Sequence, residues 1–460
     1  MSDRFPILRS LDPYHARIGY LGALASVGIR GLDRQDALAA RFHDLLFDRV
    51  FADDQRYSGL VARVPQDRRP ELDKRYLRPE EEDPTAVFTE PAPTAIEEPP
   101  ADWLLSRTSK RPRPKLVRTE WLYVSELWLY DERMPSPVGF VPREKLDRTI
   151  DLARWTGVLL PTLELSETGY LLQHLLATAR RSDPAGELFN PLCPTAHPAL
   201  PLLYFRILLA SELLYPFLVL ELVDRHGSGK ILATRGKDGL LLAATDRLLE
   251  TIGEISDPED ALGVRDVMLF RDSIAAKDST QENYLRPRLE MLVDLGFLGR
   301  RATTSKFMWD PSTATGALAR VLSPFTVSTK NVSEVLSTFL DRHYFQAASA
   351  ILSPGLRRIV DDRERMRWLG LAFEEIGREF GFTPGRTLAL KACLLAWQGG
   401  SLMEVGEVFD SVYRMAGDPE VAQFLHFSGG SRFDREFLIR IDEGLLKTVA
   451  TVQGKGGSVR

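Results

Sequence analysis

The chain has 460 residues, a length that suggests about three compact domains, and its 44% of hydrophobic residues exclude a protein that is disordered throughout. Its 59 Lys and Arg against 64 Asp and Glu give a formal net charge of −5, which argues against a protein that coats nucleic acid with its whole surface. The two cysteines, Cys193 and Cys393, lie too far apart in the sequence for a disulfide framework or a cysteine-based metal knuckle.

Residues 1–77 are predicted to form a helical region, because apolar residues recur there at the spacing of one helix face. These residues are Leu38, Phe42, Leu45, Leu46 and Val50. The N-terminus carries charges and prolines where a signal peptide would need an unbroken apolar run. We therefore expect a cytoplasmic protein.

Residues 78–118 are predicted to be a linker, since eight prolines fall between Pro79 and Pro114 and apolar residues are few. An acidic run, residues 80–83, stands near its start, and its far end is basic. The basic residues are Arg107, Lys110, Arg111, Arg113, Lys115 and Arg118. Two interpretations remain open: a basic arm that lies along phosphates, or a solvated linker whose two halves balance in charge.

After the linker the chain is predicted to be mostly helical. We divide it into a first unit at 119–180, a helical core segment at 181–260, a second unit at 261–320 and a C-terminal helical domain at 321–460. The most lipophilic stretch, residues 202–220, has the length of a membrane span. Arg206 and Glu212 lie inside it and Pro216 would break a straight helix, so we expect it to be buried in the protein core and expect no membrane contact.

The two units share a pattern when they are aligned with an offset of 139 residues. The aligned pairs are Leu146 with Leu285, Ile150 with Leu289, Ala153 with Leu292, Gly157 with Gly296, and Leu159 with Leu298. The apolar positions form one helix stripe, and each glycine suits a C-terminal helix cap that needs positive φ. In both units a turn-rich hairpin segment follows, then Thr-Gly and an apolar helical stretch.

Helix, glycine, strand, hairpin and strand is an order typical of winged helix-turn-helix proteins, and both units resemble the C-terminal half of that domain. The resemblance covers about 35 residues of the first unit and about 40 of the second. It implies a mainly α protein with two embedded winged-helix units, each with a short β-hairpin wing.

In the superfamily, the helix before the glycine commonly lies in the major groove and the wing contacts phosphates. Applied to the second unit, the resemblance implies a set of DNA-contacting residues on the helix and on the wing. They are Thr280, Gln281, Asn283, Arg286 and Arg288 on the helix, and Arg300, Arg301 and Lys306 on the wing. This assignment requires Pro287 to lie in the first turn of the helix. Glu282, Glu290 and Asp294 oppose it, because each would repel phosphate.

The first unit is less suited to DNA. Acidic and basic residues nearly cancel on its polar helix face, and its hairpin, residues 161–168, carries Glu164 and Glu167 but no basic residue. Winged helices also bind proteins, so we expect this unit to contact a protein partner.

Motifs for catalysis and cofactors are missing from the sequence. The one phosphate-loop lookalike, residues 226–230, lacks the Ser or Thr that must follow Lys230. Paired acids at 361–362 and 374–375 alternate with arginines, a pattern typical of a salt-bridged, solvated helix face. We therefore expect no cofactor and no metal, and we favour a non-enzymatic protein, while dispersed acids leave an enzyme open.

These observations give two hypotheses of function. The first is a DNA-binding subunit of a multiprotein assembly, such as a bacterial DNA-processing, regulatory or phage-defence system, that contacts double-stranded DNA through the second unit and docks protein partners elsewhere. The alternative is an adaptor whose winged helices bind proteins only. The oligomeric state does not follow from the sequence.

Overall fold

The structure is a computed structural model. It describes residues 18–27, 146–182, 193–194, 197–226, 232–233, 239–252, 258–302, 307–326, 338–377, 381–428 and 437–450. The predicted linker, with its basic residues at 107–118, and most of the predicted N-terminal helical region lie outside these ranges.

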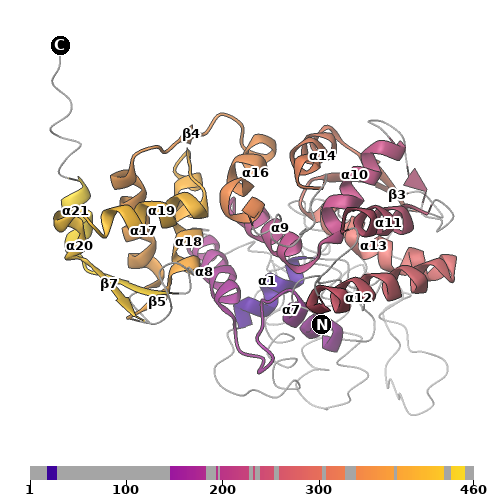
Figure 1. Cartoon of the computed structure of the whole chain (residues 1–460), viewed down its shortest axis with the longest axis horizontal. Coiled ribbons are helices and arrows are strands. Elements are labelled where there is room, and N and C mark those ends of the chain that lie inside the picture. The colour runs from indigo at the N-terminus through magenta and orange to yellow at the C-terminus, as the bar shows by residue number, and fades with distance from the viewer. Residues whose placement is uncertain are drawn as a thin grey trace, which may run out of the picture.

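The described chain is mostly helical, as expected (Figure 1). Its helices are α1 (Gly19–Val27), α7 (Leu146–Trp155), α8 (Glu167–Ser182), α9 (Leu200–Ser211), α10 (Leu214–His226), α11 (Leu240–Ile252), α12 (Pro258–Ala275), α13 (Asp278–Asp294), α14 (Thr313–Thr326), α16 (Tyr344–Leu352), α17 (Asp362–Ile376), α18 (Gly385–Gln398), α19 (Val405–Met415), α20 (Pro419–Ala422) and α21 (Gly444–Ala450). Its strands are β1 (Leu232–Ala233), β2 (Leu298–Ala302), β3 (Phe307–Pro311), β4 (Arg357–Arg358), β5 (Thr383–Pro384), β6 (Ser401–Leu402), β7 (Leu425–Ser428) and β8 (Leu438–Ile441).

The described elements fall into three regions along the long axis of the molecule (Figure 1). Helices α10 to α14 and strand β3 lie at one end, and α17 to α21 lie at the other. Helices α1, α7, α8, α9 and α16 fill the space between them. A single cluster of buried apolar side chains runs through all three regions, so the described residues share one continuous core.

Three short sheets accompany the helices. The first has the strand order β1-β3-β2 and is antiparallel, with Arg300 opposite Trp309 in the β2–β3 hairpin. The second joins β4 and β6 in parallel, and the third has the order β5-β8-β7. The strands have two to five residues each, and some of their side chains, such as Trp309 and Ile439, belong to the core.

The lipophilic stretch at 202–220 is buried in the core, as predicted. It forms most of α9 and the first half of α10, and the chain leaves the helical conformation at Glu212, whose φ is −153°. Pro216 falls in the first turn of α10, where its missing N–H costs no helical hydrogen bond. Arg206 donates to the carbonyl of Leu340 and pairs with Asp341, Nη2 to Oδ1 at 3.2 Å. None of the described helices combines the length and the apolar composition that crossing a membrane requires.

Both predicted glycine caps are present with the same hydrogen bonds. Gly157 has φ +68° and Gly296 has φ +77°. After the first helix, the N–H of Gly157 donates to Arg154 O at 3.2 Å and that of Val158 to Ala153 O at 2.8 Å. The equivalent bonds at Gly296, 139 positions later, go to Val293 and Leu292, both at 2.9 Å. This is the Schellman pattern, which satisfies the last carbonyls of a helix and turns the chain away from it.

The two units differ beyond their glycines. In the second, β2 and β3 form a regular hairpin of five paired positions. In the first, the predicted hairpin at 161–168 is reduced to one isolated bridge between Leu159 and Leu165, because α8 already begins at Glu167 and leaves no residues for a second strand. Thr168 and Thr315, of the two Thr-Gly pairs, lie in the first turns of α8 and α14.

The predicted ion-paired face of α17 is confirmed at its N-terminal end. Asp362 pairs with Arg414, Nε to Oδ2 at 2.6 Å, and with Arg365, Nη1 to Oδ1 at 3.0 Å. At the C-terminal end of the helix Glu375 pairs with Lys391 and His174 rather than with an arginine. The hydrogen bond from Arg414 lowers the pKa of Asp362 from 3.8 to about 2.

Replacing either capping glycine is expected to destabilise the protein. Gly157→Ala and Gly296→Ala should each lower the free energy of unfolding by about 1 kcal/mol, because a Cβ disfavours positive φ. The measurement is the midpoint of urea unfolding. Gly316→Ala is the control, since Gly316 lies inside α14 and a Cβ there meets nothing within 4 Å. A loss at Gly316 as large as at the other two would contradict the explanation.

Asp362 gives a pH-dependent prediction. Because its pKa is depressed in the folded state, the stability it contributes is present above pH 3.8 and is lost as the pH falls towards 2. Asp362→Asn should lower the free energy of unfolding at pH 7 by about 1 kcal/mol and should flatten the stability profile between pH 4 and 2. Thermal unfolding followed across that range checks this. An unchanged profile in the variant would assign the acid sensitivity to other carboxylates.

Candidate nucleic-acid interface

The candidate interface is built by α12, α13 and the β2–β3 hairpin, with β1 at the edge of the sheet. Helices α12 and α13 are joined by a two-residue turn, Ala276 and Lys277. Lys277 is extended, with φ −151° and ψ 130°, which ends one helix direction and begins the next. The glycine cap at Gly296 then directs the chain into β2.

One face of α13 anchors the helix in the core. The predicted stripe is confirmed at Leu289 and Leu292, which are buried, while Leu285 is half-buried. Thr315 and Ser312, at the start of α14, both donate to the carbonyl of Phe297, the residue after the glycine cap. The hairpin is therefore attached to α14 as well as to α13, and its orientation relative to α13 is fixed.

Pro287 does not lie where the resemblance required. The helix begins at Asp278, so Pro287 is an interior residue and not part of the first turn. An interior proline removes one helical hydrogen bond and crowds the preceding turn. In that turn the guanidinium of Arg288 donates a hydrogen bond to the carbonyl of Tyr284, Nη1 to O at 2.5 Å. A side-chain donor thus bonds a backbone carbonyl in the turn that the proline disturbs.

Arg288 is a core residue, and the prediction that it contacts DNA bases is wrong. Its side chain is 0% exposed, as is that of its partner Glu212. The Nε atom donates to Glu212 Oε2 at 2.9 Å and Nη2 to Oε1 at 2.5 Å, a bidentate pair. The ring of Phe270 lies 5.5 Å from the guanidinium carbon. The sequence carried a signal for this pair, since a glutamate inside an apolar stretch needs a buried cation.

Two acids that were expected to repel phosphate are also buried. Glu290 is 2% exposed and Asp294 is 0% exposed. Asp294 accepts a hydrogen bond at 3.0 Å from the backbone N–H of Ile18, just before α1. Neither carboxylate lies on the solvent side of α13, so the objection based on them does not hold.

The other predicted contact residues lie as follows. Asn283 is exposed and Arg286 is half-buried, both in the N-terminal half of α13. Thr280 and Gln281 belong to the first turn of α13, and Arg300 and Arg301 belong to β2, opposite Trp309 and Met308; the structure places their backbones. Lys306 lies outside the described residues. The candidate contact residues of the helix and of the hairpin thus lie on consecutive elements of the chain, α13 and β2.

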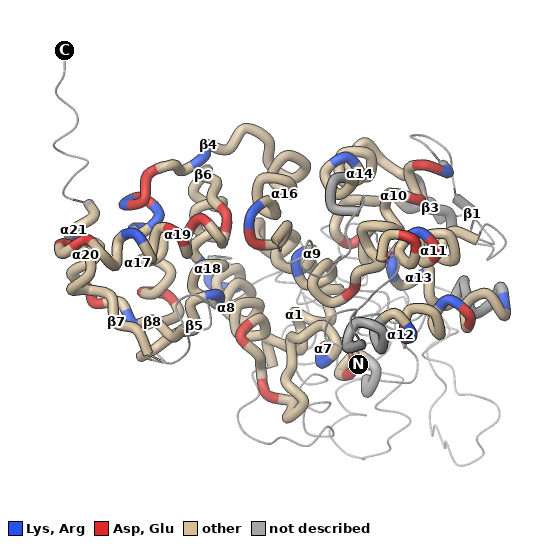
Figure 2. Tube along the Cα trace, in the orientation of Figure 1, with Lys and Arg blue, Asp and Glu red and all other residues tan. Residues whose placement is uncertain are grey.

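Residues 261–320 carry a small excess of basic over acidic residues. Residues 261–320 contain nine Lys and Arg and seven Asp and Glu. Removing the three buried residues Arg288, Glu290 and Asp294 leaves eight basic and five acidic residues. Figure 2 shows basic positions along α12, α13 and α14, with acidic ones among them. The excess is local, in contrast to the net negative charge of the whole chain.

An apolar pair stands on α12 beside these charges. Met268 is 52% exposed and Leu269 is 49% exposed, whereas most apolar residues of neighbouring α11 and α13 are buried. Exposed adjacent apolar side chains on a helix are a feature of protein contact surfaces.

Comparison with known proteins does not assign the chain to a family. No protein-family model, curated protein or solved structure matches the chain.

Breaking the buried pair tests the role of Arg288 in folding. Arg288→Met should lower the free energy of unfolding by about 3–5 kcal/mol, because it leaves the carboxylate of Glu212 buried without a counter-charge. The double variant Arg288→Met/Glu212→Leu should recover most of that loss. Chemical unfolding measures both, and Arg265→Ala on the exposed face of α12 is the control, with an expected change within about 0.5 kcal/mol. Equal stability of the single variant and the control would contradict the assignment.

Proposed function

We propose that this chain is a non-enzymatic subunit that binds double-stranded DNA through α13 and the β2–β3 hairpin, with β1, α11 to α13 and the hairpin forming a winged-helix unit. The observation that carries the proposal is the helix–turn–helix of α12 and α13, continued through a glycine cap into the hairpin. The strand order β1-β3-β2 supports it, because the hairpin strand β3 is central and β2 lies at the edge.

The chemistry of the exposed side supports DNA as the partner. A helix presents its side chains to base edges, and Asn283 can pair with adenine while Arg286 can pair with guanine or phosphate. Arg300 and Arg301 stand on the strand that begins the wing, where contacts to the DNA backbone are expected. The carboxylates of Glu290 and Asp294 are withdrawn into the core and do not oppose such contacts.

Binding of a duplex of about 25 base pairs, measured by fluorescence anisotropy, tests the proposal. We expect affinity to fall steeply with salt, with a slope of about −0.9 for each phosphate contact in a plot of log K against log salt. Arg300→Ala/Arg301→Ala should flatten that slope by about two, and Asn283→Ala should weaken binding about tenfold for a preferred sequence without changing the slope. Arg367→Ala, an exposed arginine on α17, is the control and should bind normally. Absence of duplex binding at low salt would end the proposal.

A protein adaptor is the second candidate, favoured by exposed Met268 and Leu269 on α12. It predicts that proteins co-purify with the chain from its native host and that Met268→Ser/Leu269→Ser releases them, while Arg300→Ala/Arg301→Ala retains them. The reverse pattern, with nucleic acid lost in the arginine variant, supports the DNA proposal instead.

A further inference from the structure

A large cavity lies between α8 and the C-terminal part of the chain. Its volume is about 970 Å³, near the upper end of ordinary small-molecule sites. Helix α8 forms one wall, and the opposite wall comes from the end of α17, strand β5, the start of α18 and Leu438 of β8. In Figure 1, α8 lies beside α18 at the boundary between the central helices and the C-terminal ones. We call this cavity the α8 groove.

The α8 groove is long. The residues of α8 that line it begin at Glu167 and continue to Arg181, a stretch of about 21 Å at 1.5 Å a residue. Two contacts hold the walls at a fixed separation. Thr387 of α18 donates to the carboxylate of Glu167 at one end, and His174 contacts Glu375 of α17 in the middle, Nε2 to Oε2 at 3.0 Å. The groove is therefore preformed and does not depend on a ligand to separate its walls.

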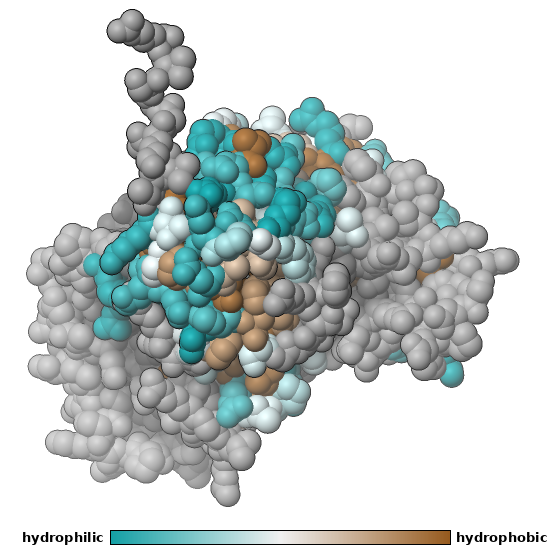
Figure 3. Space-filling model, turned by 60° about the vertical axis from the view of Figure 1, so that its left-hand side comes forward, coloured by the Kyte–Doolittle hydropathy of each residue, from teal (hydrophilic) through white to brown (hydrophobic). Residues whose placement is uncertain are grey.

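Much of the lining is apolar. Leu171 and Leu176 are each 2% exposed and contribute to the wall from α8, and Phe382 and Pro384 face them from the β5 side. Leu438 and Tyr170, among the most exposed large hydrophobic residues of the described chain, stand at the same groove. Figure 3 shows hydrophobic residues gathered beside a hydrophilic surface on one face of the molecule. An occupant must therefore present a substantial apolar body.

The two arginines of the lining lie at the C-terminal end of α8, and Glu167 lies at its N-terminal end. Arg180 and Arg181 are exposed, and His174 lies two turns earlier. Behind the wall, buried Lys391 pairs with Glu375, Nζ to Oε2 at 2.7 Å. The hydrogen bond from His174, followed by those of Lys391, lowers the pKa of Glu375 to about 2, so this carboxylate is already neutralised by its protein partners.

The guanidinium groups of Arg180 and Arg181 are available to bind an anion. No carboxylate of the described residues forms an ion pair with either guanidinium, and Arg181 makes only a long hydrogen bond, 3.4 Å, to Thr178 Oγ1. Arg181 lies close enough to Lys391 for their like charges to contribute, after burial, to a lowered pKa of that lysine. Positive charge is thus concentrated at one end of an apolar groove, where an anion would relieve it.

We propose that the α8 groove binds an acidic amphiphile: a small molecule with an extended apolar body and a terminal carboxylate or phosphate monoester. The acidic group lies against Arg180 and Arg181, and the apolar body extends along α8 past Ala177 and Leu171. Guanidinium groups suit both acids, because their paired N–H donors match two acidic oxygens. The site is separate from the α13 interface and does not rest on the DNA-binding proposal.

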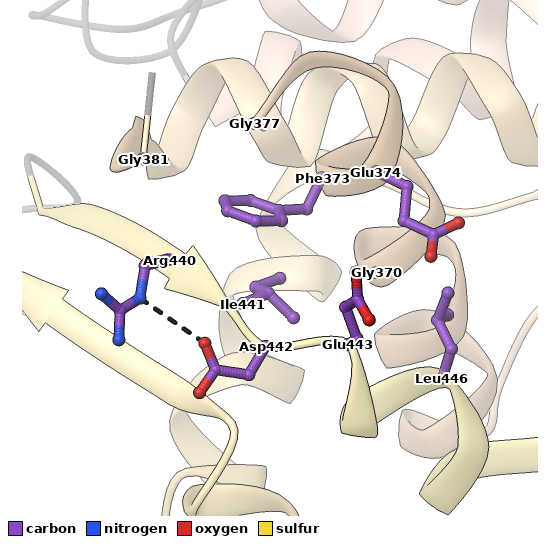
Figure 4. A pocket seen from close by; sticks show the side chains of 10 residues that line it. All are labelled: Gly370, Phe373, Glu374, Gly377, Gly381, Arg440, Ile441, Asp442, Glu443 and Leu446. Atoms are coloured by element: carbon purple, nitrogen blue, oxygen red, sulfur yellow. Dashed lines mark ion pairs between the residues drawn. The ribbon is translucent and has the colours of Figure 1, made fainter. Parts of the chain in front are cut away.

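The other cavity of note in the described chain offers a contrast. It encloses about 310 Å³ between α17, α21 and β8 and is drawn in Figure 4. Its charged lining is mainly acidic, with Glu374, Asp442 and Glu443, and Arg440 is paired with Asp442, Nε to Oδ1 at 3.5 Å. It has neither the length nor the available cations of the α8 groove.

Calorimetric titration of the full chain with four probes tests the proposal. The probes share a twelve-carbon chain and are used below their micelle concentrations: dodecanoate, dodecyl phosphate, dodecanol and dodecyltrimethylammonium. We expect the two acids to bind about tenfold or more tightly than the alcohol, and the cation to bind least. A preference between the acids distinguishes a carboxylic acid ligand from a phosphate monoester.

Two variants and a control locate the site. Arg180→Ala/Arg181→Ala should reduce the affinity for the acids to that for dodecanol, and Ala177→Trp, which places a bulky side chain in the groove, should weaken binding of all probes. Arg367→Ala removes an exposed arginine elsewhere and should change nothing. Circular dichroism confirms that each variant is folded. Equal affinity of the acids and the alcohol for the unmodified chain, or unchanged acid binding in the folded arginine variant, would overturn the proposal.

Discussion

Charges that are buried must be paired, and one such pair determines how this molecule is assembled. The guanidinium of Arg288 and the carboxylate of Glu212 are both inaccessible to water, so each is tolerable only beside the other. Glu212 stands where the chain passes from α9 to α10, and Arg288 stands in the middle of α13. The pair therefore fixes α13, together with its capping glycine and the hairpin that follows, against α9 and α10. Arg206 with Asp341 repeats the principle towards α16. Glu404 lacks such an ion pair: it accepts hydrogen bonds from the backbone N–H groups of Phe345 and Gln346, and burial raises its pKa to about 7.

Local features of the sequence predicted local features of the fold. The glycine caps, the apolar stripe of α13 and the burial of α9 and α10 follow from spacing, because each depends on residues within two or three turns of one another. The role of Arg288 did not follow, since its partner Glu212 is 76 positions away in the chain. Helical periodicity places polar residues off the apolar stripe but does not say which of them meet a charge from another element. The hairpin predicted for the first unit is shorter than expected for a related reason, because α8 begins at Glu167 and includes residues that the second strand would need.

The α8 groove lay beyond prediction for a stronger reason. Its lining comes from α1, α8, α17, β5, α18 and β8, with residues between Ser26 and Leu438. No motif spans such a set, and none of its members is unusual in its local sequence. The positive end of the groove arises because α8, with two adjacent arginines, is packed against α18, which carries the buried Lys391. The folded chain thus holds two candidate surfaces in different regions: α13 and the β2–β3 hairpin lie at one end of the molecule, and α8, which lines the groove, lies near its middle (Figures 1 and 2).

The hydrogen bond from Ile18 N to Asp294 joins residues 276 positions apart, and this separation has a consequence for synthesis. At about 5–20 residues per second, a ribosome completes Asp294 roughly 14–55 s after Ile18. The apolar residues of α1, including Tyr20, Leu21 and Leu24, are covered in the finished protein. During elongation their first available partners in the described chain are α7 and α8, which are made much earlier than α13. The N-terminal helix is therefore expected to dock on α7 and α8 while the chain is still growing and to gain its polar anchor only once α13 has been translated.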